Sequence, residues 1–406
     1  MAGPLEGIKV VEIGVWIAGP AAGLVLADWG ADVIKIEPPG LGDPGRLFQK
    51  MIGGDLPFNP PFEMDNRNKR SVVLDLRSEE GIALALELID GADVFLSNLR
   101  AGALERLGLD SDTLLARNPR LIYASITGYG LDGPDKDRAA YDIAAFWARS
   151  GLAGALKQTG RPPPHQRGGM GDHGAGMVAA GAVCAALYSR EKTGRGQKLA
   201  TSLLRQGLYT LSFDLAIYLR FGVAVLAGDR DTMPNPLINC YQDSEGAWFW
   251  IVGLEAERHW APLARAIGRP QWVDDERFQS VGARAQNATV LIPLLDEIFA
   301  SRTRQEWGAV FDTEEDVWWA PVQTIEDVVA DPQVAAAGGF VEGPAAPGTT
   351  LLPATPADFF GTPIQQRCMA PEHGQHSDEI LRELGRSEGQ IKALREAGVL
   401  GSSGGG

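Results

Sequence analysis

The sequence predicts an α/β protein, in which a Rossmann-like large domain with a parallel sheet is joined to a smaller α+β domain. Three observations predict this fold class. Residues 8–40 have the pattern of a strand, a glycine-rich turn, a helix and a strand. Strands and helices keep alternating up to residue 215, and a hairpin pattern replaces them after residue 230. Such alternation is typical of parallel sheets with helical crossovers.

The first unit opens with a β-branched run at residues 8–13, which the turn at 14–19 ends. Pro20 then starts an apolar, alanine-rich helix, and a second β run follows at 32–37. Two parallel strands joined by a helix require a right-handed crossover. The loop after the first strand lies where open α/β sheets bind ligands.

That loop does not have the dinucleotide fingerprint. A Gly-x-Gly-x-x-Gly motif should open the helix, but Trp16 and Ile17 stand between Gly14 and Gly19. Glu37 does occupy the place of a ribose-binding acid at the end of the second strand. A loop with bulky apolar residues suits a flat base or an apolar arm better than a diphosphate, so a nicotinamide cofactor is not favoured.

The remaining elements of the large domain follow in order. A loop-rich segment at 40–68 precedes further strands, which are predicted at residues 71–76, 93–97 and 121–126. A helix begins at Ser78, because two glutamates in the next turn suit the helix dipole. The small apolar residues of 174–190 indicate a buried helix, and residues 199–219 are predicted to continue as helix.

The domain boundaries come from these patterns and from composition. A hairpin is predicted around residues 243–246, and amphipathic helices follow it up to residue 311. The predicted organisation is a large ligand-binding domain at 1–215, a linker at 216–230, a small α+β domain at 231–330, a linker at 331–372, helices at 373–400 that return to the large domain, and a disordered tail at 401–406.

Composition excludes several classes of protein. The chain has 406 residues, a formal net charge of −15 and 22% charged residues. This acidic balance argues against a nucleic-acid or anionic-membrane partner. The wide spacing of the three cysteines argues against a disulfide framework or a zinc knuckle, and no metal site is predicted. There is no signal-peptide pattern or membrane span, so a cytoplasmic location is expected.

Asp142 is the first candidate for chemistry. It follows a glycine-rich turn at 128–134, after a predicted strand, among aromatic neighbours. A carboxylate at the start of a helix is most often only a cap. In a partly apolar pocket the same carboxylate could act as a nucleophile on an activated acyl group. From the spacing alone, Asp142 could be either a helix cap or a nucleophile.

Three other segments are candidates for ligand binding. The basic run at 66–71 contains Lys69, and cations of this kind suit phosphate, although most such runs are solvated loops. Residues 97–106 follow another strand, so Asn98 and Arg106 could face the same crevice. In the glycine-rich stretch at 167–173, the backbone can approach a ligand closely, Asp172 could be a helix cap, and His173 could be a base or a structural histidine.

Taken together, these segments resemble the class III CoA-transferase (CaiB/BaiF) family over most of the chain. The most specific motifs are VVEIGVWIAGPAAGLVLADWGADVIKIEPPGLGD, NRNKRSVVLDL, GYGLDGP followed by YDIAAF, and TGRGQKLATSLL. The resemblance implies a Rossmann-like large domain, a small domain and two long linkers. It also implies a homodimer whose subunits interlock like chain links, with the active site at their interface.

The resemblance also implies roles for individual residues. Asp142 matches the catalytic aspartate of the family by position. The positions that match CoA contacts are Val15, Trp16, Lys69, Asn98, Leu99 and Arg106. Pro38 departs from the pattern, because several members have an arginine there near the adenosine phosphate. Arg46 or Arg70 could compensate for it.

The implied reaction transfers CoA between an acyl-CoA and a free carboxylic acid, through an aspartyl mixed anhydride and an aspartyl-CoA thioester. CoA is then a co-substrate, and no tightly bound cofactor is expected. Backbone amides of Gly168, Gly169 and Gly171, or of the turn at 128–130, are candidates to stabilise the oxyanions. The sequence does not name the acyl group, although tryptophans in the hairpin and at 318–319 are compatible with a sizeable one.

Two alternatives stay open. The same scaffold supports α-methylacyl-CoA racemases, in which Asp142 and a histidine would exchange the α-proton. Racemases of the family usually have histidine directly before the aspartate, whereas Tyr141 stands here. A non-catalytic CoA-binding protein would require Asp142 to be only a helix cap.

Overall fold

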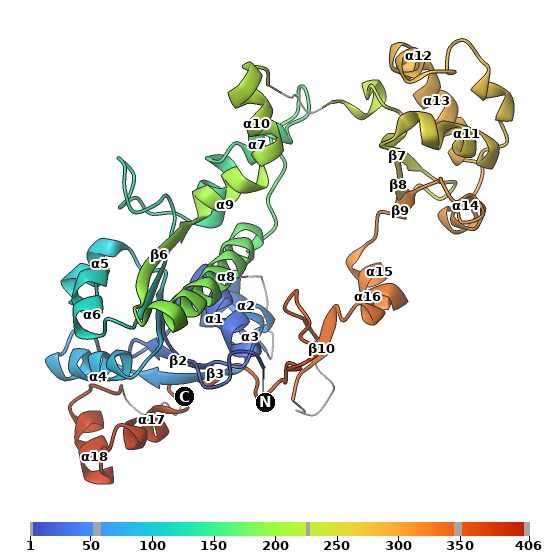
Figure 1. Cartoon of the computed structure of the whole chain (residues 1–406). Helices are drawn as coiled ribbons and strands as arrows, with labels where there is room; N and C mark the ends of the chain where they lie inside the picture. The colour runs from blue at the N-terminus through green and yellow to red at the C-terminus, as the bar shows by residue number, and fades with distance from the viewer. Residues whose placement is uncertain (1–2, 52–57, 225–227, 345–350, 402–406) are drawn as a thin grey trace. The chain divides into compact units, whose positions relative to one another are not determined.

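The computed structural model describes residues 3–51, 58–224, 228–344 and 351–401. The chain divides into two compact units (Figure 1). The larger unit consists of Met1–Gly154, Pro164–Ala224 and Ala337–Gly406, and the smaller unit of Ala155–Pro163 and Val225–Ala336. Of the predicted disordered tail at 401–406, only Gly401 lies within the described residues.

The larger unit is built on a six-stranded sheet whose paired strands are all parallel, in the order β3-β2-β1-β4-β5-β6. The strands are β1 (Lys9–Ile13), β2 (Asp32–Glu37), β3 (Lys69–Val73), β4 (Val94–Ser97), β5 (Ile122–Thr127) and β6 (Gln197–Ser202). The order reverses between β1 and β4, which creates a crevice at the carboxyl ends of these two strands. The prediction of a Rossmann-like parallel sheet is confirmed.

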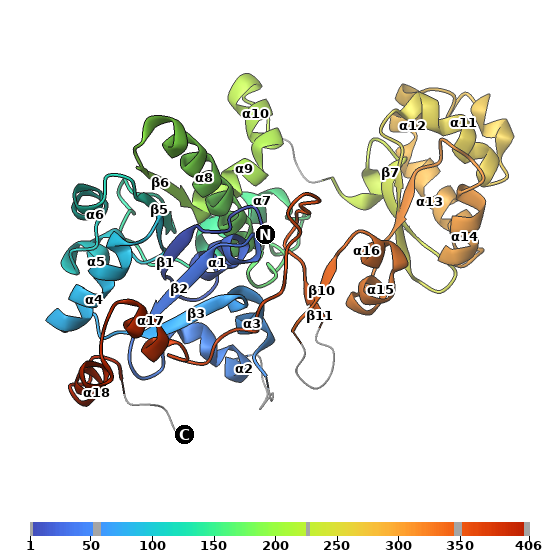
Figure 2. The same cartoon turned by 60° about the horizontal axis from the view of Figure 1, so that its bottom comes forward.

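Helices cover both faces of this sheet (Figure 2). Alternate strand residues point to opposite faces, so Val10 packs in one core and Val11 in the other. The first core contains α1 (Ala18–Asp28) and α8 (Met170–Thr193). The second contains α4 (Glu79–Asp90), α5 (Ala101–Arg106), α6 (Ser111–Arg117), α17 (Ser377–Glu383) and α18 (Glu388–Glu396).

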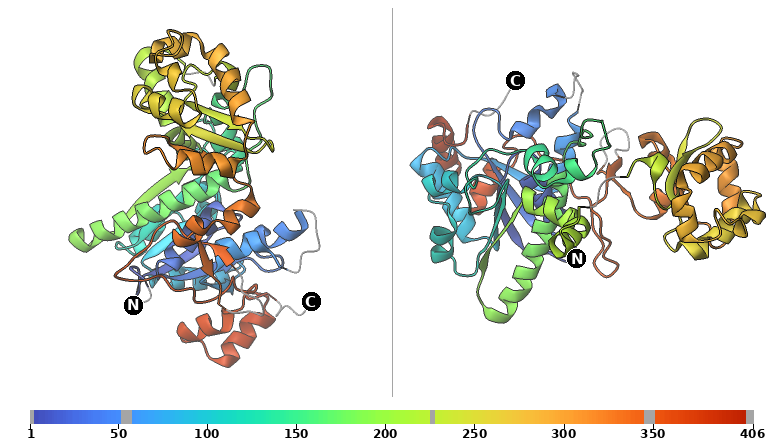
Figure 3. Two further views of the ribbon diagram at one scale, coloured as in Figure 1. Left: turned by 90° about the vertical axis from the view of Figure 1, so that its right-hand side faces the viewer. Right: turned by 90° about the horizontal axis from the view of Figure 1, so that it is seen from above.

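Small residues let α1 and the long helix α8 (green in Figure 3) approach each other closely. Every residue of α1 is buried. A Cβ on Gly176 of α8 would lie 2.9 Å from the Cβ of Ala21 and 3.2 Å from the carbonyl oxygen of Ala18. Such contacts tolerate no added methyl group. The small, apolar composition that predicted a buried helix therefore has a packing reason.

Two predictions of local structure are wrong. Residues 197–202 form β6 along the edge of β5, and helices start only afterwards, at α9 (Leu203–Thr210) and α10 (Ser212–Phe221). The Ser202 hydroxyl accepts a hydrogen bond from the Arg205 amide and so caps α9. The segment predicted to be loop-rich contains three short helices: η1 (Pro44–Leu47), α2 (Phe48–Met51) and α3 (Pro60–Asn66).

The C-terminal segment returns to the larger unit. The Val73 amide of β3 donates to the Ser377 hydroxyl at 3.1 Å, beside α17. Further upstream, Arg367 donates to the carbonyl oxygens of Ala27 and Ala31 at 2.9 Å, at the end of α1. Two short strands, β10 (Phe340–Glu342) and β11 (Leu351–Pro353), pair before this stretch. The turn at residues 141–151 contains a π-helix, η2 (Ile143–Ala148), and α7 (Leu152–Ala155) follows it.

The smaller unit contains the predicted hairpin in a three-stranded antiparallel sheet, with β7 (Ile238–Gln242), β8 (Trp248–Val252) and β9 (Trp319–Pro321). Phe249 packs in the core of this unit, whereas Trp248 and Trp250 alternate to the other face. Core packing therefore accounts for only some of the aromatic residues. The helices of this unit are η3 (Arg230–Thr232), α11 (Ala256–Ala266), η4 (Pro270–Val273), α12 (Val281–Gln286), α13 (Ala288–Phe299), α14 (Arg304–Phe311), α15 (Ile325–Ala330) and α16 (Pro332–Ala336).

Among the helices that the structure describes, none combines the length and the apolar character that a membrane crossing needs.

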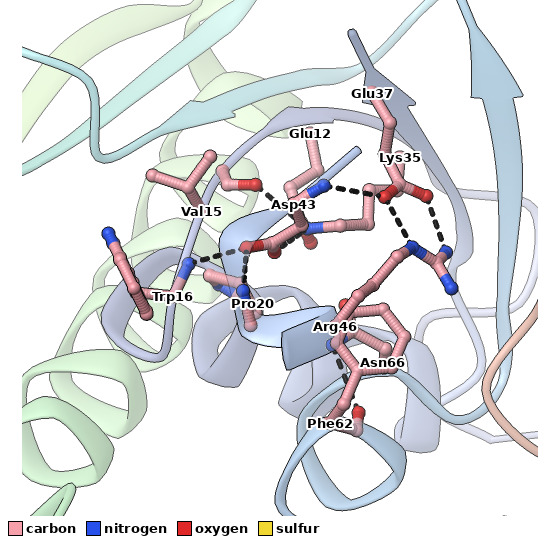
Figure 4. A network of polar contacts seen from close by, with 12 residues as sticks. Glu12, Val15, Trp16, Pro20, Lys35, Glu37, Asp43, Arg46, Phe62 and Asn66 are labelled. Carbon is pink, nitrogen blue, oxygen red and sulfur yellow. Dashed lines mark hydrogen bonds and ion pairs between the residues drawn. The ribbon is translucent and has the colours of Figure 1, made fainter. Parts of the chain in front are cut away.

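A buried network of charges joins the three strands β1, β2 and β3 (Figure 4). Glu12 of β1 accepts from Lys35 of β2 at 2.9 Å and from Lys69 of β3 at 2.8 Å, and all three side chains are fully buried. Lys35 also pairs with Asp43 at 2.8 Å. Burial acts to raise the pKa of Glu12, but the two ammonium groups outweigh it and hold the pKa below its usual value.

Replacing Glu12 by glutamine should strongly destabilise the larger unit, because it leaves two buried ammonium groups without their shared carboxylate. Removing one partner of a buried ion pair typically costs about 3–5 kcal/mol. Urea unfolding followed by tryptophan fluorescence measures the loss. As a matched control, Glu396→Gln removes one partner of the exposed pair with Lys392 and should leave the midpoint unchanged. An equally stable Glu12→Gln variant would contradict the proposed importance of the network.

Candidate functional site

The loops after β1 and β4 are locked together at the crevice where the strand order reverses. The Asn98 side chain accepts a hydrogen bond from the Val15 amide at 2.9 Å and donates one to the Val15 carbonyl oxygen at 2.8 Å. A Cβ on Gly19 would lie 2.8 Å from the same side-chain oxygen. The glycine at position 19 is therefore required by close approach of Asn98, and not by a bound pyrophosphate.

Trp16 is held in an unusual backbone conformation at the tip of the first loop. Its φ is +64°, in the left-handed region that non-glycine residues rarely adopt. Its amide donates to Asp43 at 2.9 Å, and Asp43 in turn pairs with Lys35. Its ring contacts Phe48 and Tyr141, with centroids 5.7 Å apart in both cases. The buried charge network thus positions an aromatic ring at the crevice (Figure 4).

Two adjoining cavities of about 320 and 720 Å³ follow the carboxyl ends of β4 and β5, and both are lined by Leu99, Arg100, Thr127 and Lys136. We call them together the basic groove. Its basic side chains are Arg100, Arg106, Lys136, Arg138 and Lys198, beside the acidic Glu105, Asp132 and Asp137. The excess of cations in a chain of net charge −15 makes this groove suited to an anionic ligand.

The Asp142 carboxylate is not a helix cap. It makes no capping hydrogen bond, although it stands directly before η2. Its Oδ2 instead accepts from the Gln166 side chain at 2.6 Å and from the Gly171 amide at 3.3 Å. A Cβ on Gly171 would lie 2.3 Å from the Phe146 ring, so only glycine allows α8 to approach η2 this closely. The interpretation of Asp142 as a helix cap is therefore wrong. Its carboxylate is held instead by Gln166 and by the first turn of α8.

Asp172 is the second carboxylate of this site, in the first turn of α8. No hydrogen bond to its side chain exists among the described residues, and Gly169 occupies the N-cap position that Asp172 was expected to fill. Burial, followed by the negative charge of Asp142, raises the pKa of Asp172 to about 7. A carboxylate perturbed in this way by burial and a like charge is characteristic of functional sites.

The next residue, His173, pairs with Asp65 of α3. The His173 Nε2 lies 3.0 Å from Asp65 Oδ1. The hydrogen bond with Asp65 raises the pKa of His173 above its usual value, although burial opposes this. The site therefore contains three carboxylates and one imidazole, contributed by α3, η2 and α8. From the sequence alone, Asp65 carried no signal, because it lay in a segment predicted to be loop-rich.

Of the residues expected to contact CoA, all but Lys69 lie at the basic groove or beside it. Trp16, Asn98 and Leu99 line the smaller cavity, Leu99 and Arg106 line the larger one, and Val15 is bonded to Asn98 beside them. Lys69 does not lie at the groove. It is fully buried and donates to Glu12, to the Pro20 carbonyl oxygen and to the Asn66 side chain. Its side chain therefore has no hydrogen left for a ligand.

The residues expected to replace the arginine at Pro38 are also paired within the protein. Arg46 donates to both carboxylate oxygens of Glu37, and Arg70 pairs with Asp32. Glu37 is consequently not free to bind a ribose, which removes the last sequence feature in favour of a dinucleotide. The basic groove residues Arg100, Lys136, Arg138 and Lys198 were missed, because cations scattered over two loops and a strand form no local motif.

Some of the backbone amides expected to stabilise an oxyanion already donate hydrogen bonds within the protein. The Gly171 amide is already bonded to Asp142, and the Gly130 amide donates to the Thr127 hydroxyl at 2.9 Å. No hydrogen bond from the amides of Gly168 and Gly169 is made within the described residues. These two amides lie directly before the turn of α8 that carries Asp172.

Comparisons with known proteins agree with this geometry. Residues 5–377 match the family model described as CoA-transferase family III. The chain is 31% identical to a (R)-2-hydroxy-4-methylpentanoate CoA-transferase of Clostridioides difficile, over 98% of this chain and 99% of that one. It is 34% identical to a cinnamoyl-CoA:phenyllactate CoA-transferase of Clostridium sporogenes, over 96% of both chains.

Solved structures show the same similarity. A CaiB/BaiF family protein from Brucella suis superposes with a TM-score of 0.83 at 31% identity, covering 95% of this chain and 100% of that one. A Mycobacterium tuberculosis protein crystallised as an aspartate-to-alanine mutant gives a TM-score of 0.80 at 31% identity, over 94% and 99% of the two chains.

Proposed function

Since the chain belongs to CoA-transferase family III and is therefore an enzyme of this kind, we propose that it moves CoA from an acyl-CoA to a free carboxylic acid through a covalent aspartyl intermediate. The observation that supports this mechanism is the interacting pair of carboxylates, Asp142 and Asp172, of which Asp142 directly follows Tyr141 in the lining of the basic groove. The racemase alternative is not carried forward, because the relatives described above are named as transferases.

The chemistry needs only a carboxylate and a thioester. A carboxylate oxygen of the enzyme attacks the thioester carbonyl, the C–S bond breaks, and CoA leaves as the thiolate. The thiolate then attacks the aspartyl carbonyl of the mixed anhydride, which releases the donor acid and leaves an aspartyl-CoA thioester. An acceptor acid repeats these steps in reverse. Each oxyanion can accept hydrogen bonds from the amides of Gly168 and Gly169.

The resemblance assigns the nucleophile to Asp142, and the contacts favour Asp172. The Asp142 carboxylate accepts two hydrogen bonds, both at Oδ2, which occupy the lone pairs of that oxygen and restrict its approach to a substrate. Asp172 accepts none among the described residues, and its raised pKa makes it the more basic oxygen nucleophile. In this arrangement, Asp142 keeps Asp172 basic through its negative charge, and Gln166 keeps Asp142 in place.

The acceptor is proposed to be a small carboxylic acid. The first two relatives are named for the 2-hydroxy acids 2-hydroxy-4-methylpentanoate and phenyllactate, so 2-hydroxy acids are the first acceptors to test.

We also propose that the protein works as a homodimer. The helix α10 has no buried residue in the larger unit. Together with α8, β6 and α9, it lines an apolar groove of about 750 Å³ that includes Val178, Leu208, Tyr209, Leu215 and Leu219. Apolar surface of this extent on a soluble chain indicates a protein–protein contact. A second copy of the chain is the occupant that the family resemblance implies.

Trapping the intermediate tests the mechanism. The protein is incubated with an acyl-CoA and hydroxylamine, and the modified residue is mapped by mass spectrometry. We expect the adduct at Asp172, and Asp172→Asn should lower transfer by on the order of a thousandfold or more, as loss of a covalent nucleophile does. Asp142→Asn should lower it less. An adduct at Asp142 would reverse the two roles, and no adduct at either residue would sink the covalent mechanism.

The pH dependence of the first acylation step should follow Asp172. This carboxylate must be ionised to attack, and its pKa is about 7. The single-turnover rate of acylation should therefore rise about tenfold per pH unit below this value and level off above it. Asp142→Asn removes a neighbouring negative charge, so the same profile should move to lower pH. An acylation rate that does not vary between pH 5 and 8 would contradict the assignment.

The basic groove should bind the phosphates of CoA. Arg106→Ala should weaken CoA binding by roughly tenfold or more, because a hydrogen bond to a charged group contributes about 1.5–3 kcal/mol. Isothermal titration with CoA at two salt concentrations measures this loss and a reduced salt dependence. Arg117→Ala, on the exposed pair with Asp90, is the matched control. Unchanged CoA affinity of the Arg106 variant would place the phosphates elsewhere.

A further inference from the structure

His173 stands one residue beyond Asp172, and the proposed steps do not use it. Its Nε2 is 3.0 Å from Oδ1 of Asp65. The two side chains have different surroundings: the Asp65 carboxylate is 3% exposed, whereas the imidazole is 46% exposed. A nearly buried carboxylate thus holds an accessible ring at the nucleophile. This arrangement, an acid that orients a histidine facing open space, is suited to binding a ligand.

The orientation of the ring is determined from two sides. Asp65 bonds Nε2, and the opposite edge of the ring lies over Gly169, where a Cβ would come within 3.0 Å of Cε1 and 3.1 Å of Nδ1. Gly169 has a φ of +74°, and its carbonyl oxygen accepts from the His173 amide at 2.8 Å. Within the described residues, Nδ1 has no hydrogen-bond partner. One ring nitrogen therefore remains available for a ligand.

We propose that His173, held by Asp65, binds the carboxylate of the free acid that accepts CoA. This inference rests on the proposed function, because it requires an enzyme-bound thioester for the acid to attack. His173 contacts the substrate in this role, and Asp65 acts through His173 as a positioning residue. The recognised ligand class is an unesterified carboxylate, and the acyl-CoA thioester, which has no such charge at the reacting carbon, is not recognised by this pair.

The charges around the His173 ring explain why the acceptor acid binds after the enzyme thioester has formed. The charged groups that act on this pair are Asp172, Lys69 and Lys35, and Asp142 acts in turn on Asp172. Before reaction, the ring has the ionised aspartates as its anionic neighbours. When the nucleophilic aspartate becomes a CoA thioester, that carboxylate charge disappears. The carboxylate of the acceptor then replaces the lost charge beside the imidazolium.

The resulting step balances without another reactant. An oxygen of the bound acid forms a bond with the aspartyl carbonyl carbon as the C–S bond breaks, and the electron pair leaves with the CoA thiolate. The thiolate then attacks the acyl carbonyl of the new anhydride and the aspartate leaves as a carboxylate. No proton is transferred to or from His173, so its part is to hold one oxygen of the acid while the other attacks.

The test separates the two half-reactions. His173→Gln and Asp65→Asn are compared with His373→Gln, a histidine whose ring nitrogen lies 3.0 Å from the Pro38 carbonyl oxygen, away from this pair. We expect the KM for the acceptor acid to rise roughly tenfold or more in His173→Gln, as loss of a charge-assisted hydrogen bond predicts. On the high-pH plateau of the acylation profile, where Asp172 is ionised in both proteins, the single-turnover rate of thioester formation from acyl-CoA should change by less than about twofold, because His173 takes no part in that step.

The pH profile of the second half-reaction gives an independent readout. The acid-dependent step in the native enzyme should slow as the pH rises through the pKa of His173, because the imidazolium loses its charge. Asp65→Asn keeps a hydrogen-bond acceptor but removes the partner charge, so this limb should move to lower pH, and it should vanish in His173→Gln. If His173 had only a structural role, the pH at which the acid-dependent step slows would be the same in the variants as in the native enzyme.

The outcomes are distinguishable. A His173→Gln variant that forms the thioester but uses the acid with unchanged KM and pH profile would overturn this inference and leave the proposed function standing. A variant that forms no thioester would also contradict it, provided that circular dichroism shows a folded protein. If the native enzyme itself forms no thioester, the proposed function fails first.

Discussion

The site depends on one buried carboxylate that neutralises two buried lysines. Glu12 lies in the middle of the parallel sheet and accepts from Lys35 on β2, the strand beside β1, and from Lys69 on β3, the strand beyond β2. None of these charges can be removed singly without leaving another uncompensated in a low-dielectric interior. The sheet at this point is therefore held by charge as well as by packing.

The same network extends outward to the crevice. Lys35 pairs with Asp43, which holds the Trp16 amide, and Lys69 holds Asn66 at the end of the helix that carries Asp65. Charges in the core thereby position both an aromatic ring at the crevice and the acid that orients His173. This is consistent with preorganisation, since the groups at the surface are fixed before any ligand arrives.

Small residues have the complementary role of bringing backbones together. Gly171 lets the N-terminus of α8 approach η2, so that its amide reaches Asp142. As a result, two carboxylates share a partly buried site in which one is hydrogen-bonded and the other is not. The surroundings, rather than the residue type, separate the two: Asp142 is hydrogen-bonded, whereas burial and the like charge of Asp142 raise the pKa of Asp172 and make it more basic.

The sequence by itself determined the first βαβ unit, the parallel sheet, the buried helix α8, the hairpin and the crevice with Asn98 and Trp16, because local periodicity and turn residues encode these features. Strand β6 was missed because an edge strand with mixed polarity is defined by its pairing with β5. Only the tertiary structure decided that Lys69 is buried, that Asp172 and Asp65 join the site, and that five scattered cations form one groove. Burial, hydrogen bonding and electrostatic coupling depend on residues distant in the chain, and no local pattern records them.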